Sequence, residues 1–153
     1  VEVCEYGDEA LSAQNQPLDF SACYDSLSKL NESNFKLKSL VFDAENISAN
    51  KVSPIIDALS AKGDILFQRA YADWSIDNTK SWQDQLIKTP ISAIQAFHHN
   101  EKQAVDKLIM MDAIEMAIKH NEINSFAIVA SDNGYYSLAL RLRELGKRVI
   151  GIG

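Results

Sequence analysis

The stretch KSLVFD, from Lys38 to Asp43, is the part of the sequence that decides the fold. Its apolar run ends abruptly in a carboxylate, which is typical of a strand buried on both faces of a parallel sheet. A helix is predicted directly after it, with Ser53 as the N-cap, Pro54 at the first helical position and Gly63 as the terminating residue. A buried strand followed by a helix is the first half of a βαβ unit.

The same alternation continues along the rest of the chain. Further strands are predicted from Ile65 to Ala72 and from Ile91, Ser125 and Lys147 onward. Helices are predicted from Ser81, from Lys102 to His120, and from Tyr135 to a stop at Gly146. The pattern predicts an α/β fold of three layers, α/β/α, with a mainly parallel sheet of about five strands and helices on both faces.

Residues 1–36 differ from the remainder. They are rich in Ser, Asn, Asp and Glu, they show no strong strand pattern, and one helix is predicted from Ser21 to Asn31. We therefore divide the chain into an N-terminal arm or elaboration, residues 1–36, and a domain formed by residues 37–153. The first ten residues have neither the basic nor the apolar region of a secretory signal, so none is expected here.

Composition narrows the class of protein. The 153 residues, 46% hydrophobic and 24% charged, suit one globular domain, and no apolar run approaches the roughly 20 residues of a membrane span. Cys4 and Cys23 lack the spacing of a metal or redox motif; they could pair with each other, but free thiols in a reducing cytoplasm are favoured. The net charge of −6 argues against nucleic-acid binding by bulk electrostatics alone.

Candidate functional residues lie where the predicted strands end, because ligands of an open parallel sheet bind at its carboxyl edge. The polar residues at these ends are Asp43, Glu45 and Asn46 after the first strand, Asp73 after the second, His98, His99 and Asn100 after the third, and Ser131, Asp132 and Asn133 after the fourth. Asp43 and Asp132 adjoin strands that are predicted to be buried. A carboxylate in such a place destabilises the fold unless a cation or hydrogen-bond donors pair with it. Mg²⁺ or Mn²⁺ is a suitable partner. The alternative, that both acids only shape turns, stays open.

The long predicted helix offers further acids. Lys102 and Asp106 are four residues apart and share a face near its N-terminal turn, beside the third strand's end. Asp106 stands in an apolar stretch and is preferred as a ligand, although a simple ion pair with Lys102 remains the alternative. Asp112 groups with Glu115 and Lys119 on the predicted helix. Three charged residues together indicate a helix face that is exposed to solvent.

The other candidates have simpler structural explanations. His98 and His99 point to opposite sides of a strand and cannot both ligate one ion. Trp74 and Trp82 could stack on bases, but burial in the core is the commoner role. The basic segment RLRELGKR, residues 141–148, is either a strip for a nucleic-acid backbone or a solvated helix face.

Four segments together resemble the NYN domain family of PIN-like ribonuclease domains, which includes the LabA-like bacterial proteins. They are LVFDAENI from Leu40, RAYADWS from Arg69, KQAVDKLIMMDA from Lys102 and the final segment from Ile128. The resemblance runs from about Lys38 to the C-terminus. It implies a PIN-like, Rossmann-like fold with an acidic pocket that binds Mg²⁺ or Mn²⁺ and hydrolyses RNA.

The resemblance also assigns site residues. Asp43 matches the acid that ends the first strand, and Asn46 matches the polar residue after it. Asp106 matches the acid of the family's Lys-x-x-x-Asp motif, and Asp112 is the next acid along. Asp132 matches the first Asp of the family's Ser-Gly-Asp-Ser-Asp-Phe segment.

That last segment departs from the family pattern. It reads ASDNGY from Ala130, so Gly134 stands in place of the second Asp and Ser131 in place of Gly. One ligand of the family's set is therefore missing, and Asn133 or Glu45 is the candidate to replace it.

The predicted function is a metal-dependent ribonuclease acting on single-stranded RNA. Asp43, Asp106 and Asp132, with Asp112 as a further metal candidate, would hold the ions. Substrate contacts are predicted for Asn46, Lys102, Ser131 and Asn133. The alternatives are a catalytically degenerate NYN domain that binds RNA or protein, and a phosphatase-like domain, for which no nucleophile-loop motif is present. No membrane partner is expected, and a homodimer stays open.

Overall fold

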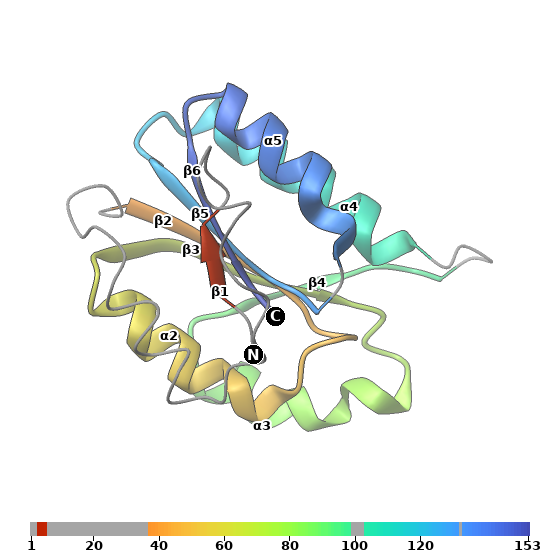
Figure 1. The fold of residues 1–153 in the computed structure, drawn as a ribbon. Helices are drawn as coiled ribbons and strands as arrows, with labels where there is room; N and C mark the ends of the chain where they lie inside the picture. Colours follow the sequence, from red (N-terminus) through yellow and green to blue (C-terminus); the bar gives the residue numbers. More distant parts are fainter. Residues whose placement is uncertain (1–2, 6–36, 99–102, 132) are drawn as a thin grey trace.

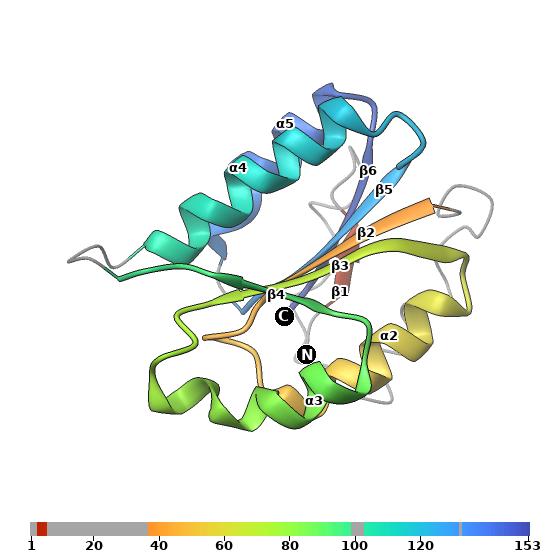
Figure 2. The ribbon, with the colours of Figure 1, turned by 180° about the vertical axis from the view of Figure 1, so that it is seen from behind.

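The computed structural model describes residues 3–5, 37–98, 103–131 and 133–153. Figure 1 shows three layers, with α2 and α3 on one face of a twisted sheet and α4 and α5 on the other. The reverse view in Figure 2 shows the same separation of the two helix pairs. The predicted three-layer α/β/α fold is therefore confirmed. The helix predicted from Ser21 to Asn31 lies outside the described residues.

The elements follow the predicted order closely. The strands are β1 (Val3–Glu5), β2 (Leu37–Asp43), β3 (Asp64–Ala72), β4 (Ser92–Gln95), β5 (Ser125–Val129) and β6 (Arg148–Ile152). The helices are α2 (Val52–Ser60), α3 (Gln83–Lys88), α4 (Ala104–Lys119) and α5 (Tyr136–Glu144). Short 3₁₀ segments precede three of them, at Ala49–Lys51, Asp77–Trp82 and Asn133–Tyr135. None of the helices in the described ranges is long and apolar enough to cross a membrane.

The strand order is β1-β6-β5-β2-β3-β4. Strands β2 to β6 form the predicted five-stranded parallel sheet, and β1 adds an antiparallel edge strand against β6. The sequence does not predict β1, because three residues are too few to display an alternating pattern.

The centre of the sheet is also its topological switch point. From β2 the chain moves outward to β3 and β4 on one side, and then α4 returns it across the sheet to β5 and β6 on the other. The connections that leave β2 and β5 consequently lie on opposite faces of the sheet, because α2 covers one face and α5 the other (Figure 1). Such a fold has its crevice between the carboxyl ends of these two strands.

Burial on both faces explains why β2 is an apolar run. Leu40 and Phe42 belong to the core beneath α2 and α3, whereas Val41 belongs to the core beneath α4 and α5. Trp82 is buried, and its indole N–H donates to the carbonyl of Ile47 at 3.1 Å. Trp74 packs against the same core, so both tryptophans have the structural role that the sequence favours.

The start of α2 differs from its prediction. The helix begins at Val52, and Ser53 donates its hydroxyl to Oε1 of Gln85 at 3.1 Å instead of capping the helix. The reason is the 3₁₀ turn at Ala49–Lys51, which sets helical backbone angles before Ser53 is reached. The predicted stop after α5 is confirmed, because Gly146 has a φ of +79°, which favours glycine.

Lys38 is a buried cation at the start of β2. Its side chain is 0% exposed, and Nζ has no hydrogen-bond partner in the described part of the chain. Burial lowers the pKa of Lys38 from 10.5 to about 8, and the nearby carboxylate of Asp64 opposes this shift. An unpaired buried charge destabilises the folded state.

We therefore expect Lys38→Met to raise the free energy of unfolding at pH 7 by about 1–3 kcal/mol. Between pH 8 and 10.5 the unfolded wild type holds more protons than the folded protein, so wild-type stability should rise with pH and the difference should shrink. Urea unfolding at pH 7 and 10 measures both effects, with Lys80→Met at an exposed position as the control. A Lys38→Met protein less stable than wild type at pH 7 would contradict this account.

Candidate functional site

Asp43, the last residue of β2, is the centre of the site. The residue is only 1% exposed. Oδ2 accepts a hydrogen bond from the side-chain amide of Asn46 at 2.8 Å, and Oδ1 accepts one from the backbone N–H of Glu45 at 3.3 Å. Asp43 thus shapes the turn after β2, but its pKa is raised, first by burial and then also by the charge of Asp106. The hydrogen bonds therefore leave its charge incompletely compensated.

Tyr135 joins Asp43 to a second carboxylate. Its hydroxyl donates to Oδ1 of Asp106 at 2.8 Å and lies 3.3 Å from Oδ2 of Asp43. Burial and the two carboxylates raise the pKa of Tyr135, so the phenol keeps its proton. A phenol has one hydrogen to share between two acids. The first turn of α4, which carries Asp106, therefore meets the end of β2 through the hydroxyl of Tyr135.

The loop after β5 contacts the same place. The register pairs Phe42 with Val129, so β2 and β5 end at the same edge of the sheet. The hydroxyl of Ser131 donates to the backbone carbonyl of Asn46 at 3.0 Å. The residue before Asp132 therefore touches the loop that follows Asp43. Asn133 begins the 3₁₀ turn that leads to α5, while Asp132 and Lys102 lie outside the described residues.

Asp112 lies elsewhere, about 9 Å farther along α4 by helix geometry. Its Oδ2 accepts a hydrogen bond from the hydroxyl of Tyr71 at 3.0 Å and pairs with Arg69 at 3.4 Å. The predicted solvated face is only partly found, because Asp112 is half-buried and pairs with β3, while Glu115 and Lys119 are exposed and pair with each other. The charge of Asp112 is thus paired with the guanidinium of Arg69, and Asp112 is not joined to Asp43.

A hydrogen-bonded network extends the site toward β4. Oε1 of Glu45 accepts the backbone N–H of Asp73 at 2.8 Å and lies 2.6 Å from Nε2 of His98. Hydrogen bonds from Ser75 and Gln95 lower the pKa of Asp73 to about 2. Asp73 is thus satisfied by its neighbours, and Glu45 is directed toward β3 and β4. His99 and Asn100 lie outside the described residues.

The donor set suits a hard divalent cation. Asp43 and Asp106 present carboxylate oxygens, and Oδ2 of Asp106 accepts no hydrogen bond from the described residues. The raised pKa of Asp43 indicates a place where positive charge would be stabilising. Among the residues that the structure describes, no three His, Cys, Asp or Glu side chains form a metal cluster. Asp132, the predicted third carboxylate, lies outside the described residues.

Sequence reasoning missed Tyr135 and the partner of His98. The sequence places Tyr135 only on the apolar face of its helix, and nothing in that pattern distinguishes a hydroxyl directed at two acids from a buried ring. The contact between Glu45 and His98 joins residues 53 apart, and no local pattern predicts such a pair.

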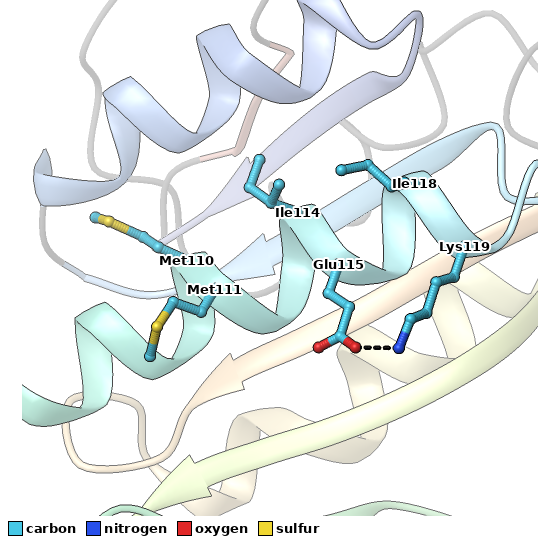
Figure 3. Close-up of a pocket in the computed structure, with 6 residues that line it drawn as sticks. All are labelled: Met110, Met111, Ile114, Glu115, Ile118 and Lys119. Atoms are coloured by element: carbon cyan, nitrogen blue, oxygen red, sulfur yellow. Dashed lines mark hydrogen bonds and ion pairs between the residues drawn. The ribbon is translucent and has the colours of Figure 1, made fainter.

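The described surface includes a polar hollow and an apolar one. One, of about 520 Å³, borders the loop after β2. The other, of about 570 Å³, is an apolar groove on the outer side of α4, shown in Figure 3 with the Glu115–Lys119 ion pair at its edge. The groove is lined by Met110, Met111, Ile114, Glu115, Ile118 and Lys119. None of these residues contributes to the acidic site.

Comparison with known proteins gives a family and a fold. The NYN domain family matches residues 39–153. No curated protein matches the sequence. A crystal structure of a protein of unknown function from Vibrio parahaemolyticus is similar over 78% of this chain and 82% of that chain, with a TM-score of 0.57 and 16% identity. At that identity the likeness shows the fold alone.

Proposed function

Because the chain belongs to the NYN domain family of PIN-like nuclease domains, we propose that it is a metal-dependent ribonuclease. Its substrate is single-stranded RNA, and its reaction is hydrolysis of a phosphodiester bond. The observation that carries this proposal is the meeting of Asp43 and Asp106 at the switch point of the sheet, with one phenolic proton between them. A buried acid whose charge is incompletely compensated, joined to a second carboxylate, favours a divalent cation as its partner.

Each residue then has a defined task. Asp43 and Asp106, together with Asp132, would hold Mg²⁺ or Mn²⁺, which would supply an activated water and neutralise charge on the phosphate. Asn46 fixes the orientation of the Asp43 carboxylate through its side-chain amide. Ser131 connects the loops after β5 and β2. Lys102 neutralises a backbone phosphate, and Asn133 contacts the substrate.

The second candidate is a degenerate NYN domain that binds RNA or a protein without cleavage. Gly134 favours it, because this exposed residue stands where the family motif has a second acid. Titration with Mn²⁺ by calorimetry separates the two candidates. Tight binding that is lost in Asp132→Ala supports the enzyme, whereas absence of binding supports the degenerate domain.

The direct test is cleavage of labelled single-stranded RNA by the purified protein with Mn²⁺ or Mg²⁺. We expect cleavage that stops when EDTA removes the metal and that is absent in Asp132→Ala. Double-stranded RNA and a small phosphomonoester serve as comparison substrates. If the wild type cleaves no RNA with either metal, the enzyme proposal fails.

Two acids of α4 provide a matched pair of variants. Asp106→Asn removes a carboxylate beside Asp43 and should reduce cleavage by at least about 100-fold. Asp112→Asn removes the partner of Arg69 and should leave the rate within about threefold while lowering stability by on the order of 1 kcal/mol. Cleavage rates and thermal unfolding of both variants measure this. Equal loss of activity in the two variants would place Asp112 in the site as well.

A further inference from the structure

A polar pocket of about 520 Å³ adjoins the acidic site. One wall is the loop that follows β2, from Ala44 to Asn50, and the other is the helical segment from Asn78 to Lys88. Its volume falls within the range of about 300–1,000 Å³ that is usual for small-molecule sites. The mechanism proposed above uses one residue of its lining, Asn46.

Side-chain amides dominate the chemistry of this pocket. The lining contains Asn46, Asn50, Asn78 and Gln85, each of which carries both a donor and an acceptor. The side chains of Asn50 and Asn78 make no hydrogen bond within the described part of the chain. Oε1 of Gln85 accepts the hydroxyl of Ser53, so its NH₂ group remains available to donate. Paired donors and acceptors of this kind match the edges of nucleobases.

The charges of the pocket favour a base over a phosphate. The lining contains Asp84 and a single cation, Lys88 at the end of α3, while the carboxylate of Glu45 is engaged with Asp73 and His98. Asp84 and Lys88 balance in charge, so a phosphate gains no net attraction, whereas the amino groups of bases are good donors to a carboxylate. No aromatic residue contributes to the lining, so recognition here depends on hydrogen bonds, without stacking.

Asn46 connects the pocket to the acidic site. Its side-chain amide holds Asp43 at 2.8 Å, and the same residue lines the pocket. A nucleotide next to the phosphate at Asp43 is therefore within reach of the pocket. Single-stranded RNA can turn its bases outward, so they can be read on their Watson–Crick edges.

We propose that this amide-lined pocket binds the base of the nucleotide adjacent to the scissile phosphate and gives the protein a base preference. The proposal rests on the ribonuclease function in one respect: the phosphate beside the bound base is the one that is cleaved. Base binding itself does not require catalysis. Asn50 and Asn78 supply the contacts that discriminate among bases, and Gln85 adds a donor.

The first test measures base binding without cleavage. The four nucleoside 5′-monophosphates, which contain no phosphodiester bond, are titrated into the full chain with Mg²⁺ and followed by NMR. We expect one base to bind at least about threefold more tightly than the others and to shift the side-chain NH₂ signals of Asn50 and Asn78. Equal binding of all four, or no shift of these signals, overturns the proposal.

The second test uses three isosteric variants that add the same charge. Asn50→Asp and Asn78→Asp replace a donor by an acceptor inside the pocket. Asn121→Asp does so in the turn after α4, at the opposite end of the sheet. We expect the pocket variants to change the preferred monophosphate or to reduce discrimination about tenfold, and the control to behave as wild type. Identical behaviour of all three overturns the proposal.

The two proposals fail differently. Selective binding without any RNA cleavage would keep the base pocket and reject the ribonuclease. Cleavage of random RNA with no base preference beside the cut, unchanged in Asn78→Asp, would keep the ribonuclease and reject the base pocket.

Discussion

Asp43→Asn is expected to abolish metal-dependent RNA cleavage, with a rate at least about 1,000-fold below that of the wild type. The variant keeps the size of the side chain and removes the charge that pairs with the cation. Metal ions contribute several kcal/mol to stabilisation of a phosphoryl transition state, and each 1.4 kcal/mol corresponds to a factor of ten in rate. Cleavage of labelled single-stranded RNA at saturating Mn²⁺ measures the loss.

The same substitution should act on stability in the opposite direction. In the folded metal-free protein the pKa of Asp43 is raised above 3.8, so the folded state binds its proton more tightly than the unfolded chain does. Ionisation of Asp43 therefore costs stability as the pH rises from 3.8 through the folded-state pKa. We expect Asp43→Asn to be more stable than the wild type at pH 7 and the advantage to be lost below about pH 4.

Asp57→Asn, at an exposed position in α2, is the control for both measurements. It should change neither the cleavage rate nor the pH dependence of unfolding. An Asp43→Asn protein that still cleaves RNA at more than a tenth of the wild-type rate would remove Asp43 from the site. A variant that is less stable than the wild type at every pH would mean that its carboxylate is already compensated.

Tyr135→Phe should weaken metal binding and cleavage by about 10–100-fold. The hydroxyl contacts Oδ1 of Asp106 and Oδ2 of Asp43, so it orients both acids and leaves Oδ2 of Asp106 for a cation. Groups that orient metal ligands in this way typically contribute factors of this size. Without metal, the loss of a buried donor to two acids should also cost about 1–3 kcal/mol of stability.

Calorimetry with Mn²⁺ and unfolding in EDTA separate these two effects of Tyr135→Phe. Tyr136→Phe, at the next position and exposed on α5, is the matched control. Tighter metal binding in Tyr135→Phe would show the reverse arrangement, in which the hydroxyl occupies the position that the cation needs.

Most of the fold can be predicted from periodicity and termination signals. The run from Lys38 to Asp43 specifies a strand buried on both faces, and the five parallel strands and four helices follow the predicted order. Two features resist this reasoning. The three residues of β1 are too few to show the alternating pattern of a strand. The start of α2 depends on a 3₁₀ turn whose residues have no capping signature.

The site is only partly accessible from the sequence. The end of a strand and the first turn of a helix indicate that Asp43 and Asp106 face one edge of the sheet, and the structure brings them together. Their catalytic role remains a prediction. The direction of a side chain across the sheet is set by tertiary packing, so the sequence reveals neither the hydroxyl of Tyr135 between the acids nor the pairing of Asp112 with Arg69.

The antiparallel pairing of Val3–Glu5 with β6 makes part of the N-terminal segment an edge strand of the sheet. The family match starts at residue 39, but a fragment cut there would expose the edge of β6 along Ile150, Gly151 and Ile152. A bare apolar strand edge is a template for pairing with other chains. Val3–Glu5 cover this edge, so a shortened version is expected to aggregate even though it keeps Asp43 and Asp106.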